Sequence, residues 1–535
     1  MTALAVLLMG AGLGSAAWAA DDKKAAKAAE KAADKPVAYD PTYREPFGTW
    51  GEGRLIGALP PDLQVNTDGD VVGQGFHLDS RLRAGAVAGP KQWRFSAELD
   101  LFEGQIAGDP WDLTDTPDAR ERDVIGFSDP DTGSFSAQRA VEVRRAAMNG
   151  RLGPVGLELG LVTSHWGLGM IANDGAHDPT FGRNDFGDRV LRARIATRPF
   201  NGGKLPLYVI GAFDRVVEDE IGQWTPFHGV EDDPTTAADE AALANGQAAY
   251  NGILSFLYND LKQKQAAGLY GVYRTQTEAD GERKTRVFVV DGYWDWTWKV
   301  GGDTLRTAIE AATINGFTDR AQTYSAREGV KIRAGSVTGL VGYQPAKAPL
   351  EGLLRFGWQS GDGDPDDGTV HELGWDRDFD VGMVMFDEVQ GSIDAGIYRQ
   401  LNNPEHSGGP PEGVEALVSE GGAKAVMFVQ PVVQTQPIDL LQIKVGWLPG
   451  WSTRPIAHPF TTYRNGGNPA NFQGTPTTGY WLGSEVDWAI LVGDQAVTPA
   501  KLRPAFLVQG GHYFASADMG GETHHLLMGE ARVRW

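Results

Sequence analysis

Three aspartates in one short stretch have the spacing of a metal site. Asp362, Asp364 and Asp366 stand at alternate positions, and calcium-binding loops place oxygen ligands at their first, third and fifth positions. The EF-hand pattern is incomplete, because Asp367 replaces the required Gly and no Glu follows at the twelfth position. Ca2+ at this stretch is one interpretation, and a solvated run of loop charges is the other. No other cofactor is predicted.

The residue types of hydrolytic catalysis are present, but not in a catalytic pattern. Ten histidines are scattered along the chain, and neither GxSxG nor HExxH occurs. Ser164 and His165 are adjacent, yet adjacent side chains of a strand point to opposite faces, whereas a nucleophile and its base must meet within hydrogen-bond distance. Cys is absent, which excludes disulfides, thiolate metal sites and thiolate nucleophiles. We therefore expect no enzyme.

Charged residues that alternate with apolar ones are far more numerous. Between Trp93 and Leu101 every second residue is apolar, and the residues between them are polar or charged. A β-strand turns successive side chains to opposite faces, so this pattern predicts strands with one apolar and one charged face. Similar stretches lie at residues 76–84, 190–195, 441–447, 480–490 and 525–535.

In a barrel whose apolar faces contact lipid, the opposite faces line the lumen. The charged residues that we expect to line it are Arg81, Arg83, Arg94, Glu98, Asp100, Arg144, Arg192, Arg194, Asp291, Glu310, Arg355, Lys444, Glu485, Asp487, Arg532 and Arg534. Over all candidate strands such bases and acids are equally numerous, so the excess of bases that strong anion selectivity requires is missing. These charges either pair across neighbouring strands and stabilise the hydrated inner face of the barrel, or they form a polar pathway for solutes. The aromatic residues considered for stacking on sugar rings are Tyr208, Tyr270, Tyr293, Trp481 and Tyr513.

The alternating stretches recur along the whole body of the chain, each bounded by Gly, Pro, Asp or Asn. Candidate strands lie near residues 50–59, 72–86, 91–103, 138–152, 155–164, 187–198, 205–214, 265–276, 284–298, 303–314, 331–343, 351–360, 381–389, 424–434, 438–448, 479–491, 501–515 and 523–535. We predict 16–18 strands, because single-chain bacterial barrels have an even number. Residues 237–261 differ, since Ala, Leu and Tyr recur there at helical spacing. They predict a helix that folds into the lumen or caps the rim.

Further features favour a membrane barrel over a soluble β-sandwich or β-propeller. The apolar faces often end in aromatics, namely Trp93, Trp294, Trp296, Trp298, Trp358, Trp447, Trp488 and Trp535, as in the aromatic girdles of membrane barrels. Short connections such as Gly153-Pro154 alternate with long acidic ones such as residues 361–380. No repeat of fixed length is visible, which argues against a propeller. The predicted fold is an all-β transmembrane antiparallel β-barrel with long acidic extracellular loops.

The N-terminal residues predict a signal peptide followed by a periplasmic extension. Residues 1–20 are largely apolar and end in small residues before a charged stretch, which is typical of a signal peptide, although no Lys or Arg precedes the apolar run. The alternative is a buried helix. Residues 21–46 are rich in Ala and Lys and have no wide apolar stripe, so they predict a periplasmic extension, either a spacer or a contact for peptidoglycan or a partner. The barrel would then comprise residues 47–535.

Composition excludes several other classes. The chain of 535 residues has 70 acidic and 48 basic residues, a formal charge of −22, which argues against a nucleic-acid partner. Mean hydropathy is −0.30, and beyond the N-terminus no apolar run is long enough for a transmembrane helix. Alternating strands remain compatible with that mean value.

The last residues, Glu530 to Trp535, alternate and end on an aromatic. This segment resembles the C-terminal signature of bacterial outer-membrane β-barrel proteins. The resemblance implies that Trp535 is an assembly signal read by the barrel assembly machinery. It also implies a Gram-negative outer membrane, with lipid and lipopolysaccharide around the barrel.

A narrower resemblance concerns about 35 residues. The stretch Phe356 to Pro365, followed by Asp376 to Phe379 and by Val381-Gly382, is similar to one segment of alginate-export-type porins. It implies an exporter-like monomeric barrel, but the family's arginine-rich pore is not matched here. We therefore predict a porin-like channel for small polar solutes or saccharides. The alternative is a structural or adhesion barrel without an open pore.

Overall fold

The fold is taken from a computed structural model, which describes only part of the chain. The described residues are 47–59, 63–64, 71–72, 76–90, 92–108, 139–183, 187–200, 205–218, 248–277, 283–319, 326–363, 367–376, 378–391, 393, 424–458, 461–462, 465–466, 468–493 and 502–535. The predicted signal peptide and periplasmic extension lie outside these residues.

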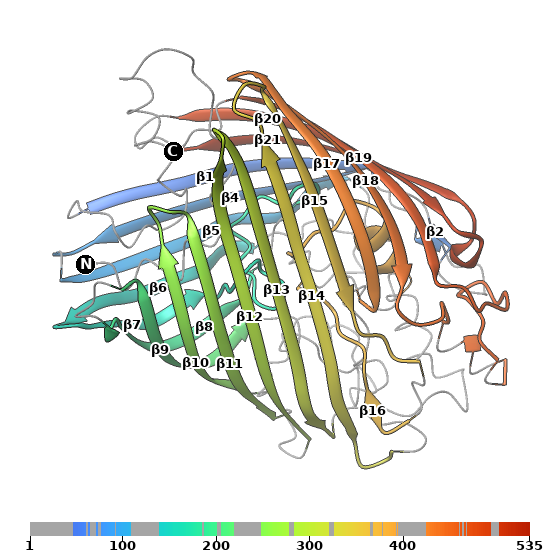
Figure 1. The fold of residues 1–535 in the computed structure, drawn as a ribbon, viewed down its shortest axis with the longest axis horizontal. Coiled ribbons are helices and arrows are strands. Elements are labelled where there is room, and N and C mark those ends of the chain that lie inside the picture. The colour runs from blue at the N-terminus through green and yellow to red at the C-terminus, as the bar shows by residue number, and fades with distance from the viewer. Residues whose placement is uncertain are drawn as a thin grey trace.

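The regular secondary structure of the described residues is almost entirely β (Figure 1). The long strands are β1 (Phe47–Leu59), β4 (His77–Ala88), β5 (Trp93–Gly108), β6 (Arg139–Leu152), β7 (Val155–Thr163), β8 (Arg189–Thr197), β9 (Leu207–Glu218), β10 (Ala248–Asp260), β11 (Gln265–Thr277), β12 (Lys284–Val300), β13 (Asp303–Thr318), β14 (Val330–Gln344), β15 (Leu350–Gln359), β17 (Val426–Ile438), β18 (Leu441–Ser452), β19 (Trp481–Gly493), β20 (Arg503–Ala515) and β21 (Thr523–Arg534). Three two-residue strands are β2 (Leu63–Gln64), β3 (Val71–Val72) and β16 (Thr369–Val370). Two short helical turns are η2 (Met385–Gln390) and η4 (Ala517–Met519). Among the described residues no helix is long and apolar enough to cross a membrane.

The long strands close into one antiparallel barrel. Each pairs with its neighbour in the chain, and β21 pairs with β1 to complete the ring, with Glu52 opposite Arg534 and Leu59 opposite Leu527. The described sheet has 19 strands including the two-residue β16, which pairs parallel to β14, so eighteen strands form the antiparallel ring. Closure leaves no sheet edge, and every strand finds backbone hydrogen-bond partners on both sides.

The two faces of the barrel wall differ in polarity as the alternation predicts. On β8, Leu191 and Ile195 are exposed, while Arg192 and Arg194 are buried. Apolar residues at equivalent positions, such as Phe213 and Trp447, cover the exterior of other strands. An even-stranded closed barrel with an apolar exterior is the architecture of bacterial outer-membrane proteins. The predicted all-β antiparallel barrel of 16–18 strands is confirmed, and its apolar exterior agrees with the predicted placement in the outer membrane. The long acidic extracellular loops stay a prediction.

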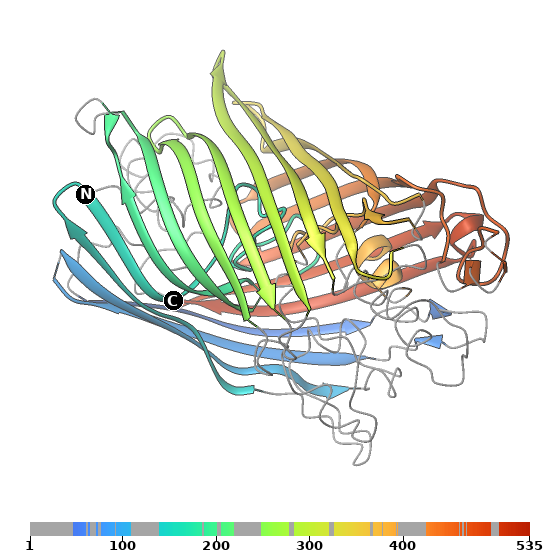
Figure 2. The same ribbon diagram turned by 90° about the horizontal axis from the view of Figure 1, so that it is seen from below.

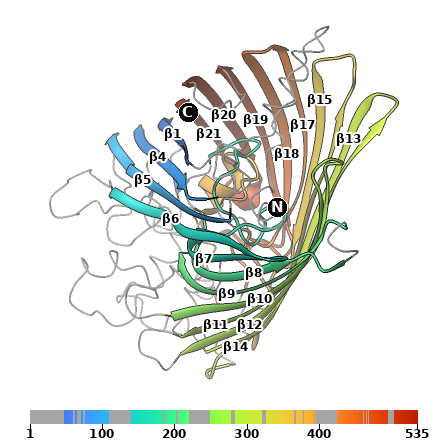
Figure 3. The same ribbon diagram turned by 90° about the vertical axis from the view of Figure 1, so that its left-hand side faces the viewer.

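Short and long connections lie at opposite ends of the barrel. Gly301-Gly302 joins β12 to β13, and Asp439-Leu440 joins β17 to β18, whereas long segments join β7 to β8 and β15 to β17 at the other end. Phe47 pairs with Ala88 beside the short β4–β5 turn, so β1 starts at the short-turn end. Two parts of the long connections fold back into the barrel, as Figures 2 and 3 show.

Two of the predicted elements are wrong, and their errors cancel in the strand count. The segment predicted to be a helix contains strand β10 from Ala248 to Asp260. Both faces of β10 are apolar, because Ile253 and Leu257 pack inside the barrel while Leu254 and Phe256 face outward, and this double pattern imitates helical spacing. Residues 381–389, predicted to be a strand, lie inside the barrel and overlap η2.

The polarity of the wall predicts how strand β8 tolerates charge. Leu191 is 49% exposed on the outer face. An Arg at such a lipid-facing position costs about 2–4 kcal/mol near the membrane midplane. L191R should therefore lower the amount of heat-modifiable, folded protein in outer-membrane fractions, whereas the control L191F should not. Equal amounts of the two variants would contradict the lipid-facing assignment.

Trp535 contributes to closure, and we predict that its ring is required. Its backbone N–H donates to the carbonyl of Gly51 (3.0 Å), and its carbonyl accepts from the backbone N–H of Gly51 (3.1 Å). Its indole covers Gly51 so closely that a Cβ there would lie 2.0 Å from the ring. W535D, or deletion of Trp535, should lower the yield of heat-modifiable protein, and W535F should restore it. Undiminished yield after deletion would remove Trp535 as an assembly signal.

Candidate functional site in the barrel interior

None of the sixteen charged residues that were predicted to line the lumen is exposed on the apolar exterior of the barrel. Twelve are buried, and Arg355, Lys444, Arg532 and Arg534 are half-buried. Most pair with a residue on a neighbouring strand. Arg192 donates two hydrogen bonds to Asp214 (2.8 and 2.7 Å), and Arg83 donates two to Asp100 (2.7 Å each).

These ion pairs hold the wall together as well as making it polar. Removing one partner of a buried pair leaves an uncompensated charge, which typically costs about 3–5 kcal/mol. Glu158 lies between two bases, 2.9 Å from Arg194 and 4.0 Å from Arg145. The alternation had placed Arg144 inside but had missed Arg145. The β5–β6 register shifts at this point, with Glu98 opposite Arg145 and Leu99 opposite Val143, and such a bulge turns two successive side chains inward.

The first inner segment, residues 164–183, crosses the barrel between β7 and β8 (Figure 3). Its contacts reach strands on all sides. Trp166 Nε1 donates to Asp291 on β12 (3.1 Å) and Leu168 N donates to Glu310 on β13. At its other end Arg183 donates to Asp79 on β4 (2.6 Å), and Gly182 N donates to Gln509 on β20 (3.1 Å). Only a segment inside the ring can make all of these contacts.

A glycine of the barrel wall leaves space for a side chain of the first inner segment. Phe181 packs on β18 at Gly446, where a Cβ would come within 2.7 Å of its ring. Lys444, two residues earlier on the same strand, donates to the carbonyl of Thr180 (3.3 Å).

The second inner segment, residues 371–391 without the undescribed residue 377, lies beside the first. Trp375 Nε1 donates to Ser336 on β14 (2.6 Å), and Arg355 on β15 donates to the carbonyl of Asp380 (2.7 Å). Glu485 on β19 accepts from the backbone N–H groups of residues 383, 384 and 385, at 2.6, 2.9 and 2.6 Å. Figure 3, which looks into the barrel, shows the short orange helical turn within the ring of strands.

An apolar core inside the barrel explains why this segment folds inward. Trp375, Met383 and Phe386 pack with Phe181 of the first inner segment and with Phe428 of the wall. Asp376, Asp378 and Asp380 are carried into the interior with them and are buried. The interpretation of residues 361–380 as a solvated acidic loop is therefore wrong for Asp376, Asp378 and Asp380, because they are buried in the interior together with the apolar residues among them.

The inner segments also cover part of the predicted wall. Glu310, Asp291, Glu485 and Asp487 point inward but are almost completely buried. Glu310, Asp291 and Glu485 hold the inner segments through hydrogen bonds to Leu168, Trp166 and the second inner segment. Asp487 instead accepts from Gln430 of the wall (3.4 Å). The sequence could not reveal this, because the covering residues are more than 100 positions away.

The aromatic residues considered for sugar stacking have other roles. Tyr270 stacks on Trp166 with ring centroids 4.8 Å apart, and Tyr293 meets the same ring edge-on at 6.0 Å. Tyr208 and Tyr513 are buried. Trp481 is exposed and lies 5.0 Å from Trp451. The four tyrosines therefore pack within the protein.

A more accessible charge cluster lies where the first inner segment meets the closing strands. Asp178 is 45% exposed at its side chain and accepts from Arg532 (2.7 Å) and Arg534 (3.1 Å) of β21. Although burial opposes it, the charges of Arg532 and Arg534 hold the pKa of Asp178 well below its usual value. Arg534 also pairs with Glu52 (2.6 Å). The cluster joins two acids and two bases and was not anticipated, since Asp178 lies in a connection.

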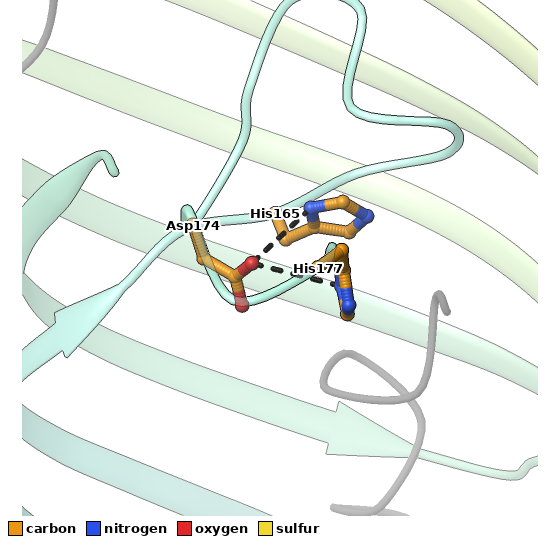
Figure 4. A group of neighbouring side chains, drawn as sticks. All are labelled: His165, Asp174 and His177. Atoms are coloured by element: carbon orange, nitrogen blue, oxygen red, sulfur yellow. Dashed lines mark ion pairs between the residues drawn. The ribbon is translucent and has the colours of Figure 1, made fainter. Parts of the chain in front are cut away.

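Three further residues of the first inner segment meet at one point (Figure 4). Oδ1 of Asp174 lies 3.5 Å from Nδ1 of His165 and 3.6 Å from Nε2 of His177. Burial lowers the pKa of His165 to about 4, so its imidazole is neutral at pH 7. Ser164 faces another partner and accepts a hydrogen bond from Arg192 (3.0 Å).

The calcium prediction stays a prediction. Asp362 is buried and accepts from the backbone N–H of His371 (3.0 Å). Asp364 and Asp366 lie outside the described residues.

Fold and interior together define a membrane-spanning β-barrel whose charged lumen is crossed by two inner segments. No protein-family model and no curated protein matches the chain. Solved structures with a similar fold are OccAB1 of Acinetobacter baumannii (10% identity, 91% of this chain and 96% of that one, TM-score 0.47) and a BenF-like porin of Pseudomonas fluorescens Pf-5 (11%, 92% and 99%, 0.47). The outer membrane protein OpdK of Pseudomonas aeruginosa is another (10%, 91% and 98%, 0.46). At these values the likeness assigns neither a family nor a solute.

The role of Glu485 predicts how the second inner segment is released. Both carboxylate oxygens of Glu485 accept from backbone N–H groups of the second inner segment, and E485Q replaces one of these oxygens with an NH2 donor. Each buried N–H group that loses its acceptor then costs about 1–3 kcal/mol of stability. The purified variant should stay heat-modifiable, and a protease should cut residues 381–391 faster. E351Q is the control, because Glu351 accepts only from Gln434 of the wall among its described hydrogen bonds. Equal cleavage of both variants would show that Glu485 does not anchor the segment.

Proposed function

We propose that the chain is a channel of the bacterial outer membrane through which small polar solutes diffuse down their gradients. The observation that carries this proposal is the polarity of the closed barrel, apolar outside and charged inside. A charged interior is costly unless it is hydrated or paired. Here both conditions are met, because pairs such as Arg192–Asp214 are buried while Asp178 and Arg534 stay partly accessible.

The arrangement of the interior supports one route for the solute. The second inner segment packs through apolar residues against β17, β18 and β19. The wall formed by β21, β1 and β4, which is separated from β19 only by β20, carries Arg532, Arg54 and Arg81 with their acidic partners. We therefore place the route along this polar wall, past the cluster of Asp178, Arg532 and Arg534.

The chemistry of this wall favours charged or zwitterionic solutes over neutral sugars. Acids and bases are interspersed along it, so they can replace the hydration of either kind of charged group. The buried tyrosines offer no free ring for stacking. The resemblance of residues 356–382 to alginate-export-type porins supports solute passage and does not identify the solute.

A barrel without an open pore is the second candidate, and the inner segments favour it. Both cross the lumen and bond to the wall on several sides. A planar-bilayer recording on purified protein separates the candidates. Discrete conductance steps would support the channel, and silence of heat-modifiable protein would support the closed barrel.

The position of Asp178 predicts the selectivity of the channel. D178N removes the acid that faces Arg532 and Arg534, so the reversal potential in a salt gradient should shift toward anion selectivity. D439N is the matched control, because it removes one negative charge from an exposed turn. A shift of the same size in the control, or none in D178N, would place the conducting route elsewhere.

A further inference from the structure

The group of His165, Asp174 and His177 is built from neighbouring turns of the first inner segment. Trp166 N donates to the carbonyl of Ala172 (3.0 Å), which folds the chain back and brings His165 to Asp174. Asp188 N donates to the carbonyl of Asn173 (2.7 Å) and closes the base of the loop. Backbone hydrogen bonds therefore set the positions of these side chains, whatever binds between them.

The carboxylate of Asp174 is oriented toward both rings. Its Oδ1 accepts from the backbone N–H of Ala176 (3.1 Å), and the same oxygen faces His165 and His177. Figure 4 shows the two imidazoles converging on this oxygen from different sides. The ring centroids lie 4.6 Å apart, with an angle of 77° between the planes.

The distances match those between ligands of one metal ion. A tetrahedral site with bonds of about 2.0–2.2 Å separates its ligand atoms by about 3.3–3.6 Å. The two measured distances from Asp174 Oδ1 are 3.5 and 3.6 Å, and the ligand atoms of the group all lie within 4.8 Å of one another. A small closure of the third side would complete three corners of a tetrahedron.

His165 supplies an independent observation that points to a ligand. Its side chain is only 4% exposed, yet neither ring nitrogen makes a hydrogen bond of normal geometry within the described part of the chain, although Asn173 and Gly167 lie beside it. Buried polar atoms in native proteins nearly always have a partner. An ion between His165 and Asp174 would supply that partner for Nδ1.

We infer that His165, Asp174 and His177 bind one divalent transition-metal ion of the zinc class. Two imidazoles and one carboxylate suit Zn2+, Ni2+ or Cu2+, whereas Ca2+ and Mg2+ prefer sites made only of oxygen. Three protein ligands leave a fourth position open. His177, 23% exposed at its side chain, lies on the accessible side of the group.

The charges around the group permit a cation. Arg144 lies close and donates to the carbonyl of Asp174 (2.7 Å). It is held 3.5 Å from Glu98 and 3.6 Å from Asp100, so acids of the wall balance its charge. The bound ion would tie the start of the first inner segment, at the end of β7, to the turn at Asp174.

Metal binding by the full chain, folded in detergent, tests the inference. Equilibrium dialysis against Zn2+ followed by elemental analysis should give one tightly bound ion per chain, which millimolar Ca2+ does not displace. H177Q and D174N should each weaken Zn2+ binding by more than about 100-fold, because loss of outer-sphere partners alone costs about 10–100-fold. H177Q changes a partly exposed side chain, so it keeps the test valid if H165A fails to fold.

The double variant H512Q/H525Q is the matched control. These two histidines form a pair on the outer face, with Nδ1 atoms 2.7 Å apart, and would report adventitious binding there. Absence of binding by the wild type, binding that survives H177Q and D174N, or binding lost only in the control would overturn the inference. Displacement by Ca2+ would overturn the zinc class. Conductance is measured separately, so none of these results bears on the proposed channel.

Discussion

The rest of the structure depends on the antiparallel pairing of β21 with β1. In hydrocarbon an unpaired backbone N–H or C=O costs several kcal/mol, and this single contact removes the two edges that an open sheet would expose. The pairing runs from Leu59–Leu527 to Glu52–Arg534 and joins residues almost 500 positions apart. It also creates the enclosed interior, so every buried ion pair and both inner segments rely on it.

The inner face of the barrel wall has a charged part and an apolar part. On one side ion pairs between neighbouring strands satisfy the inward-facing charges, as in Arg83–Asp100. On the other side apolar residues such as Phe428 and Leu448 face inward and pack on the second inner segment. The interior is therefore part polar wall and part hydrophobic core, whereas a simple alternation of faces would make it polar throughout.

Alternation along the sequence was sufficient to predict strands such as β5 and β8, because one face of each meets lipid and the other meets charges. It failed at β10, where Ile253 and Leu257 are apolar and face inward. At residues 381–389 it failed for the related reason that apolar side chains are buried in the lumen without belonging to the wall. Arg145 was missed because a bulge changes the phase of β6. The group of His165, Asp174 and His177 was also missed, since only the fold of a connection brings these residues together.

The two inner segments are attached to different parts of the wall, yet Asp376 joins them. Its N–H donates to the carbonyl of Met170 (3.0 Å), and its carboxylate accepts from Asn173 N (2.9 Å). A displacement of either segment must therefore break these hydrogen bonds or move the other segment with it. Substitutions in one segment should show energetic coupling to substitutions in the other, with double-mutant effects that depart from additivity, as for residues in one hydrogen-bonded network. The lumen contains one mechanical unit made of two chain segments, and a solute that pushes on one of them acts on both.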